Sequence, residues 1–252
     1  MGNFLKRSSI IVWCIALLGA LSFTQVGYAA DKGIPVLLYH RVGYTNDALT
    51  VKPERLRNDL IKLKKNGYST ISLEMFEQYI TGKNVEIPVK PILITFDDSY
   101  QDNYDNALTI LKENNCVATF FVITGMVDHN QDRLTSSEIK EMAALGMSFG
   151  SHTVSHTPLT QNSEEWLGNE LAFSKQFLEE LLGKPTVSIA YPEGKYTPMS
   201  ISLVIEKGYD LGFTVEPGIC TRQTPLLKLP RIPVFFYTGD IVEIVHKYEN
   251  GM

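Results

Sequence analysis

Cysteine is scarce in this chain of 252 residues, which contains only Cys14, Cys116 and Cys220. Cys14 lies in an apolar N-terminal segment, and the other two stand far apart and outside any C-x-x-C spacing. Two such residues make neither a disulfide framework nor a cysteine-based metal site. We therefore predict two free, buried thiols, and any bound metal must use other ligands.

A basic surface is also missing. The formal net charge is -5, and no run of Lys and Arg forms a basic stripe. This balance excludes the field that attracts nucleic acid. Repeats, low-complexity tracts and Pro-rich or Ser-rich linkers are absent too, so nothing marks the start of a second domain.

The N-terminus has the layout of a secretory signal peptide, which we assign to residues 1–30. Lys6 and Arg7 precede the apolar stretch Ile10–Leu21, and small residues follow near Ala29 and Ala30. The stretch is shorter than the roughly 20 residues of a membrane-spanning helix, although an uncleaved anchor stays an alternative. We expect export, with residues 31–252 acting outside the cell, at its surface or associated with membrane or cell wall.

Beyond residue 31, short apolar runs alternate with amphipathic helical patterns, which is typical of parallel strands joined by helices. We predict one α/β domain, an irregular (β/α) barrel of about seven parallel strands. The expected strands are Ile34–Tyr39, Pro91–Phe96, Val117–Ile123, Met147–Ser151, Val187–Tyr191, Leu211–Val215 and Leu229–Val234. The expected helices are Pro53–Lys65, Asn103–Glu113, Ser163–Leu182, Asp240–Tyr248 and one that begins at Ser136.

Polar residues follow two of these strands, where the active sites of such barrels lie. Residues 95–100 have the sequence TFDDSY, so Asp97 and Asp98 stand where a buried strand ends. Two adjacent carboxylates repel each other unless a positive group intervenes. The alternative is that Asp98 or Ser99 merely caps the following helix.

Residues 151–156 have the sequence SHTVSH, which places His152 and His156, two of only five histidines, after another strand. Alone, this spacing also occurs by chance on solvated helices. Two neutral imidazoles and one carboxylate, however, form a common ligand set for a catalytic divalent ion with an open position for water. We expect Zn²⁺, with Co²⁺ or Ni²⁺ as alternatives, and the remaining carboxylate can serve as a base.

These two motifs resemble the first two motifs of the polysaccharide deacetylases, the NodB-homology domain of carbohydrate esterase family 4. Their order and separation match, and the resemblance covers most of the chain beyond residue 31. It implies that Asp97 is the catalytic base and that Asp98, His152 and His156 bind the metal. It also implies N-acetylglucosamine units of a polysaccharide as substrate.

The family's third motif, Arg-x-Pro-Tyr/Phe-Gly, is altered here. Residues 190–194 have the sequence AYPEG, with Ala190 where the family has the arginine that orients the base. We predict that Arg231 supplies this positive charge instead, although it could be a surface residue. The AYPEG form, like LYHR at residues 38–41, is similar to the branch that deacetylates poly-N-acetylglucosamine. The backbone N–H near Glu193 is a candidate oxyanion donor.

The family's C-terminal histidine, which acts as general acid, has no clear counterpart, because His246 lies in a predicted helix without the usual residues before it. We predict His40 for this role, since it directly follows the first strand. A structural histidine is the alternative. Tyr191 and Tyr100 are predicted to contact sugar rings, as are Tyr44 and Tyr196, although aromatic residues also fill barrels.

The expected activity is metal-dependent N-deacetylation of poly-N-acetylglucosamine, peptidoglycan or a chitin-like polymer by a monomer. Two alternatives stay open: a glycan-binding module that has lost catalysis, and an O-deacetylase acting on sugar esters. Asp97 favours an enzyme, because a module that only binds glycan does not need a base.

Overall fold

The structure is a computed structural model that describes residues 33–160 and 162–251. The predicted signal peptide, residues 1–30, lies outside the described residues. Within the described ranges, no helix is long and apolar enough to cross a membrane.

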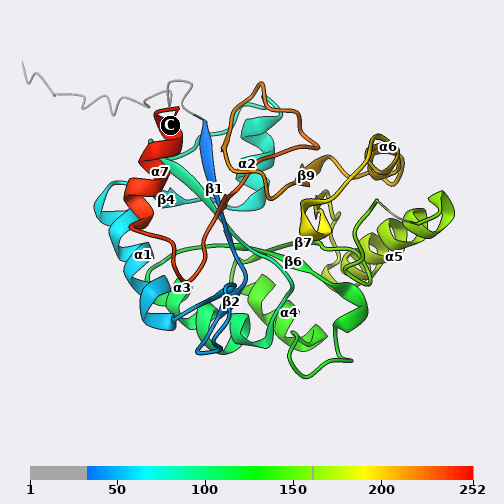
Figure 1. Ribbon diagram of the computed structural model, residues 1–252, viewed down its shortest axis with the longest axis horizontal. Helices are drawn as coiled ribbons and strands as arrows, with labels where there is room; N and C mark the ends of the chain where they lie inside the picture. Colours follow the sequence, from blue (N-terminus) through cyan, green and yellow to red (C-terminus); the bar gives the residue numbers. More distant parts are fainter. Residues whose placement is uncertain (1–32, 161, 252) are drawn as a thin grey trace, which may run out of the picture.

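A curled parallel sheet forms the centre of the molecule (Figure 1). Its strands run in the order β1, β5, β6, β7, β8, β9, each parallel to the next. Their bounds are Ile34–Tyr39, Pro91–Phe96, Thr119–Val122, Ser148–Ser151, Ser188–Ala190 and Leu211–Phe213. Six predicted strands are thus confirmed, four of them one to three residues shorter than expected. The predicted α/β barrel with its single domain describes this architecture.

The seventh predicted strand, Leu229–Val234, is wrong as a continuous strand. Only β11 (Ile232–Pro233) pairs with β1, in parallel, while Leu229 forms a separate parallel bridge to Phe213 of β9. Pro230, which lies between the two pairing segments, lacks the N–H that a ladder needs, which explains the interruption. The segment 229–233 still connects both edges of the curled sheet, and Arg231 lies in the middle of it. A further strand, β10 (Ile219–Cys220), pairs antiparallel with β1.

The predicted helices are present as α1 (Pro53–Lys65), α4 (Ser136–Ala144), α5 (Glu164–Leu182) and α7 (Ile241–Glu249). The expected helix Asn103–Glu113 is divided into a π-helix, η1 (Asn103–Leu108), and α3 (Thr109–Glu113). Elements that we had not predicted are α2 (Leu73–Ile80), α6 (Pro198–Glu206), the short strands β2 (Arg41–Val42), β3 (Thr50–Val51) and β4 (Ser69–Thr70), and the 3-10 turns η2 (Thr124–Met126) and η3 (Pro192–Gly194).

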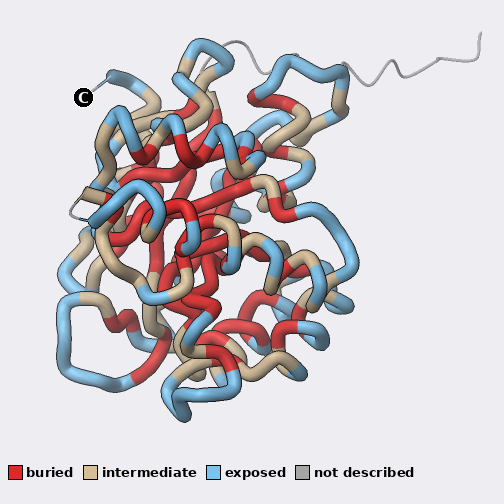
Figure 2. Tube along the Cα trace, turned by 90° about the vertical axis from the view of Figure 1, so that its right-hand side faces the viewer, coloured by how far each residue is buried: buried red, intermediate tan, exposed pale blue. Residues whose placement is uncertain are grey.

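The two faces of the strands separate two parts of the core. Figure 2 shows the buried segments concentrated in the interior of the molecule. On β5, Ile92, Ile94 and Phe96 pack outward with residues of α1, α3 and α7. Leu93 points inward, into a cluster with Phe121. Because side chains alternate along a strand, Thr95 and Asp97 point to the same inner side as Leu93. The strand therefore delivers Asp97 into the barrel.

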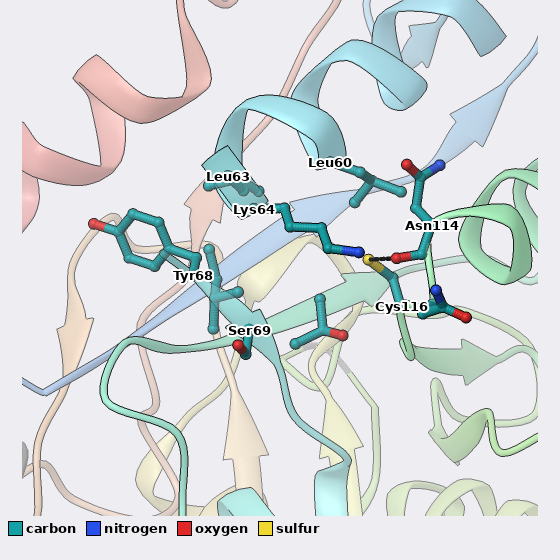
Figure 3. A pocket seen from close by; sticks show the side chains of 10 residues that line it. Leu60, Leu63, Lys64, Tyr68, Ser69, Asn114 and Cys116 are labelled. Carbon is teal, nitrogen blue, oxygen red and sulfur yellow. Dashed lines mark hydrogen bonds between the residues drawn. The ribbon is translucent and has the colours of Figure 1, made fainter. Parts of the chain in front are cut away.

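Cys116 and Cys220 are free thiols, as predicted. Cys220 is fully buried, whereas Cys116 is half-buried. Cys116 borders a small cavity of about 110 Å³ near the start of β5, together with Lys64 and Tyr68 (Figure 3). This cavity lies at the N-terminal edge of the sheet, opposite the edge at which Asp97 lies.

Candidate metal centre and catalytic site

Asp97 and Asp98 occupy a tight, buried turn directly after β5. The exposed fractions of the two residues are 2% and 7%. Asp98 and the next residue, Ser99, both have a positive φ, of 71° and 50°, a conformation that non-glycine residues rarely adopt. Oδ1 of Asp98 and Oγ of Ser99 have no hydrogen-bond partner among the described residues, so neither residue caps the following helix. The turn instead directs the Asp98 carboxylate at the loop that follows β7.

That loop carries both histidines. The Nε2 atoms of His152 and His156 lie 3.4 Å and 3.2 Å from Oδ1 of Asp98. The nitrogen Nδ1 of His152 lies 2.7 Å from the carbonyl oxygen of Ala190, and a carbonyl oxygen only accepts, so Nδ1 carries the proton. In the neutral ring, Nε2 is then an acceptor that faces another acceptor.

This arrangement fits a bound cation. Oδ1 of Asp98 is buried and has no hydrogen-bond donor among the described residues. Ligand atoms that share one Zn²⁺ at roughly 2.0–2.2 Å lie about 3.0–3.5 Å apart, which matches both contacts. One ligand atom each from Asp98, His152 and His156 lies within 4.8 Å of the others. A divalent cation between Oδ1 of Asp98 and the two Nε2 atoms would coordinate all three and so remove their mutual repulsion.

Arg231 lies on the other side of Asp97 and is fully buried. Its two terminal nitrogens donate to the two carboxylate oxygens of Asp97, each at 2.7 Å. Its Nε donates to the carbonyl oxygen of Thr214 at 2.8 Å, and Nη1 also approaches Oγ1 of Thr95 at 3.2 Å. The guanidinium predicted for this position is thus present, in a fixed bidentate geometry.

The electrostatics of Asp97 follow from this pairing. Burial would raise the pKa of Asp97, but the adjacent guanidinium of Arg231 outweighs it and holds the pKa below the usual value. The carboxylate therefore stays ionised. Its Oδ2 lies 3.9 Å from Nε2 of His152, so the base borders the ligand set.

His40 lies at the same edge, directly after β1. Burial lowers the pKa of His40, while the carboxylates of Asp97 and Asp98 act in the opposite direction. Its Nδ1 is buried and has no partner among the described residues. Its carbonyl oxygen accepts a hydrogen bond from Asn103 at 2.8 Å, which anchors the backbone at this position.

The tyrosines differ from the expectation. Tyr191 is fully buried, and its hydroxyl donates to the carbonyl oxygen of Leu227 at 3.0 Å. Its ring therefore belongs to the core and is not available to stack on a sugar, which corrects our prediction. The ring packs in a core cluster that includes Leu167 and Val204.

Tyr100 lies beside the site, but its ring is engaged by arginines. The guanidinium carbons of Arg41 and Arg133 lie 4.2 Å and 3.9 Å from the ring centroid. Burial and the neighbouring Asp98 carboxylate raise the pKa of the Tyr100 hydroxyl. The two guanidinium groups occupy the ring of Tyr100, so its hydroxyl is the part that is available to the site.

Glu193 lies in the turn after β8 with a positive φ of 54°. Its side chain pairs with Lys195 at 2.6 Å, and that pairing lowers the pKa of the exposed carboxyl. The carboxylate thus points to Lys195, and only the backbone of this turn is a candidate to contact a reacting group. The oxyanion role of the N–H stays a prediction.

Two supporting residues escaped the sequence analysis. Thr95 donates to the carbonyl oxygen of Leu37 at 2.7 Å and is the second side chain that Arg231 approaches. The alternation along β5 could have identified it, because Thr95 is the polar residue two positions before Asp97. Glu170, which contacts the histidine loop, had no local signal within its helical pattern.

The curled parallel sheet and the polar cluster at its C-terminal edge define an α/β protein of the NodB-like (β/α) barrel class. Residues 84–212 match the family model described as polysaccharide deacetylase. The chain belongs to this family of deacetylating hydrolases.

Solved structures and a curated relative agree with this assignment. The Streptococcus pyogenes deacetylase PplD, in complex with acetate, is 33% identical with a TM-score of 0.80, over 86% of this chain and 98% of that chain. IcaB from Ammonifex degensii is 28% identical with a TM-score of 0.76, over 87% and 97%. A poly-beta-1,6-N-acetyl-D-glucosamine N-deacetylase of Staphylococcus aureus is 29% identical over 80% of this chain and 72% of its own length.

Proposed function

We propose that this protein removes N-acetyl groups from N-acetylglucosamine units of a polysaccharide outside the cell, in a reaction that depends on a divalent metal. One observation carries the proposal: a buried Asp97, held by two hydrogen bonds from Arg231, borders the Asp98, His152 and His156 ligand set. The S. aureus relative, named for this reaction on poly-beta-1,6-N-acetyl-D-glucosamine, supports the choice of substrate.

Asp98, His152 and His156 would hold the metal. A bound divalent cation such as Zn²⁺, Co²⁺ or Ni²⁺ polarises the acetamide carbonyl and lowers the pKa of a water molecule at its open position. The hydrogen bond from His152 to the carbonyl oxygen of Ala190 fixes the ring orientation and leaves Nε2 for coordination.

Asp97 acts as the general base. Each of its oxygens accepts one hydrogen bond from Arg231 and retains a further lone pair. Because Arg231 keeps the carboxylate ionised and fixes its plane, an oxygen is available to take the proton of the attacking water. Arg231 is itself fully buried, and its Nε donates to the carbonyl oxygen of Thr214, which holds the guanidinium in place.

His40 acts as the general acid that protonates the departing amine. It lies in the field of both carboxylates and follows a strand next to β5. In this proposal the backbone N–H near Glu193 and the hydroxyl of Tyr100 stabilise the negative oxygen of the tetrahedral intermediate and contact the sugar. Loss of acetate leaves a free amine on the polymer.

We further propose that residues 1–30 direct export and that residues 31–252 act on an external polymer as a monomer. We favour poly-N-acetylglucosamine and peptidoglycan equally as the substrate. Chitin-like oligomers carry the same acetamide group and are a further candidate. The structure of the relative PplD is a complex with acetate, the compound that deacetylation releases.

Acetate release by the full chain tests this function on β-1,6-linked and β-1,4-linked N-acetylglucosamine oligomers. We expect release with added Zn²⁺, loss after chelation, and loss in Asp97→Asn, while the exposed control Asp105→Asn stays active. Binding of oligomers without release would favour a glycan-binding module. Release from acetylated sugar esters but not from amides would favour an O-deacetylase. Either result would refute the proposal.

A further inference from the structure

The loop that carries the two histidine ligands has an unusual backbone. Thr153 and His156 both adopt a positive φ, of 65° and 63°. Non-glycine residues rarely take this conformation, and they keep it only where their surroundings over-determine it. The hydrogen bonds of the loop show what holds it.

All five backbone N–H groups from residue 152 to residue 156 have an acceptor. His152 donates to the carbonyl oxygen of Val122 at 2.8 Å. Thr153 donates to Oγ of Ser151 at 3.0 Å, and His156 to Oγ1 of Thr153 at 3.1 Å. The remaining two, from Val154 and Ser155, leave the loop and converge on one atom.

That atom is Oε2 of Glu170, at 3.0 Å from the Val154 nitrogen and 2.8 Å from the Ser155 nitrogen. Glu170 belongs to α5, and only 8% of the residue is exposed. A carboxylate is rarely buried without partners, and hydrogen bonds to an ionised acceptor are about twice as strong as neutral ones. The two amides are therefore held more firmly than a neutral side chain would hold them.

The opposite side of the loop is fixed as well. The N–H groups of Thr124 and Gly125 donate to the carbonyl oxygens of Thr153 and Val154 at 3.1 Å and 2.9 Å. A side chain at Gly125 would place its Cβ only 2.7 Å from the oxygen of Val154, so glycine permits this approach. The peptide groups between the two histidines are thus held from the η2 side and from the α5 side.

From this geometry we propose that Glu170 is a positioning residue for the metal centre, and this inference rests on the proposed function. Its carboxylate holds the amides of residues 154 and 155, and this sets the spacing of the imidazoles of His152 and His156 around Asp98. Glu170 touches neither the ligand atoms nor the substrate. Its removal therefore weakens and distorts coordination while Asp97 and Arg231 remain in place.

The test measures metal binding by the purified full chain with Co²⁺ and Zn²⁺, using competition with a chelator and the visible spectrum of bound Co²⁺. We expect Glu170→Ala to bind each metal about 10–100-fold more weakly, as is usual when a group that orients a ligand is removed. The Co²⁺ spectrum should change with it. Glu170→Gln, which keeps an acceptor oxygen, should regain part of the affinity.

Glu165→Ala is the matched control, because Glu165 is an exposed residue of the same helix. Unchanged metal affinity and an unchanged Co²⁺ spectrum in folded Glu170→Ala would overturn the proposal. If Glu170→Ala does not fold, Glu170→Gln decides, and parent-like affinity and spectrum in that variant would refute it. A parent protein that binds no metal would instead contradict the proposed function.

Discussion

Arg231 donates to both carboxylate oxygens of Asp97, each at 2.7 Å, across a separation of 134 positions in the sequence. Both side chains are buried, so solvent screens this pair little. Ala190 occupies the position at which the family has its own arginine. In this chain the cation beside Asp97 comes instead from the segment between β9 and β11.

Replacement of Arg231 should abolish activity and reduce stability. In Arg231→Met the buried Asp97 charge loses its partner, a change that costs about 3–5 kcal/mol in other proteins. Urea unfolding and acetate release measure the two effects. The exposed Arg222→Met is the control and should behave like the parent. A stable, active Arg231→Met protein would show that Asp97 needs no cation.

Stability should fall at acid pH because of Asp97. Its pKa in the folded protein lies below the value of about 3.9 for an unfolded chain. Ionised Asp97 thus contributes stability that is fully present above the unfolded pKa and is lost as pH falls through the folded pKa. Urea unfolding of the chelated protein from pH 7 to pH 2 should show a smaller acid loss in Asp97→Asn. Identical profiles would contradict the role of the pair.

His40 should determine the limb of the activity profile that descends as pH rises, and burial, which lowers its pKa, should place this limb below the ordinary histidine range. A general acid must be protonated, and rising pH removes that proton, so kcat/KM should decline with pH through the pKa of His40. His40→Gln should lower kcat by about 10²–10⁴-fold and lose this decline. Metal affinity, measured by chelator competition, should not change. The control is His129→Gln, at an exposed loop position. Full activity in His40→Gln would exclude this acid.

The two thiols should react slowly in the native protein. Burial raises the pKa of both Cys116 and Cys220, which removes the reactive thiolate. Alkylation followed by mass spectrometry should label Cys220 only after unfolding, and Cys116 only slowly before it. Reducing agent should leave the urea midpoint unchanged. A midpoint that depends on reductant would indicate a disulfide that the structure lacks within its described residues.

Sequence patterns predicted the parts of this protein that depend on local periodicity. Alternating and apolar runs located six strands, and polar residues directly after two of them located Asp97, Asp98, His152 and His156. Arg231 followed from a missing charge at Ala190, because a buried carboxylate needs a partner from somewhere in the chain. The predictions of strands and motif residues use rules that hold over a few residues. The prediction of Arg231 uses the need of a buried carboxylate for a positive charge.

Contacts between distant segments were beyond such rules. Glu170 resembles any other helical glutamate until the fold places it against the amides of residues 154 and 155. Tyr191 has a side chain suited to contact a sugar ring, but its burial depends on packing against residues of α5 and α6, which are distant in the sequence. The π-helix Asn103–Leu108 has an ordinary helical pattern in the sequence. Its side chains donate to the carbonyl oxygens of residues 40 and 42, which belong to a distant segment of the chain.

Arg231 follows Asp97 by 134 positions, and this separation affects when the pair can form during folding. Asp97 and the ligands of the metal centre are synthesised first, and the counter-charge arrives only with the segment that joins β9 to β1. Closing so long a loop is slow relative to local structure formation. A chain that ends before Arg231 would leave the buried carboxylate of Asp97 without its guanidinium partner.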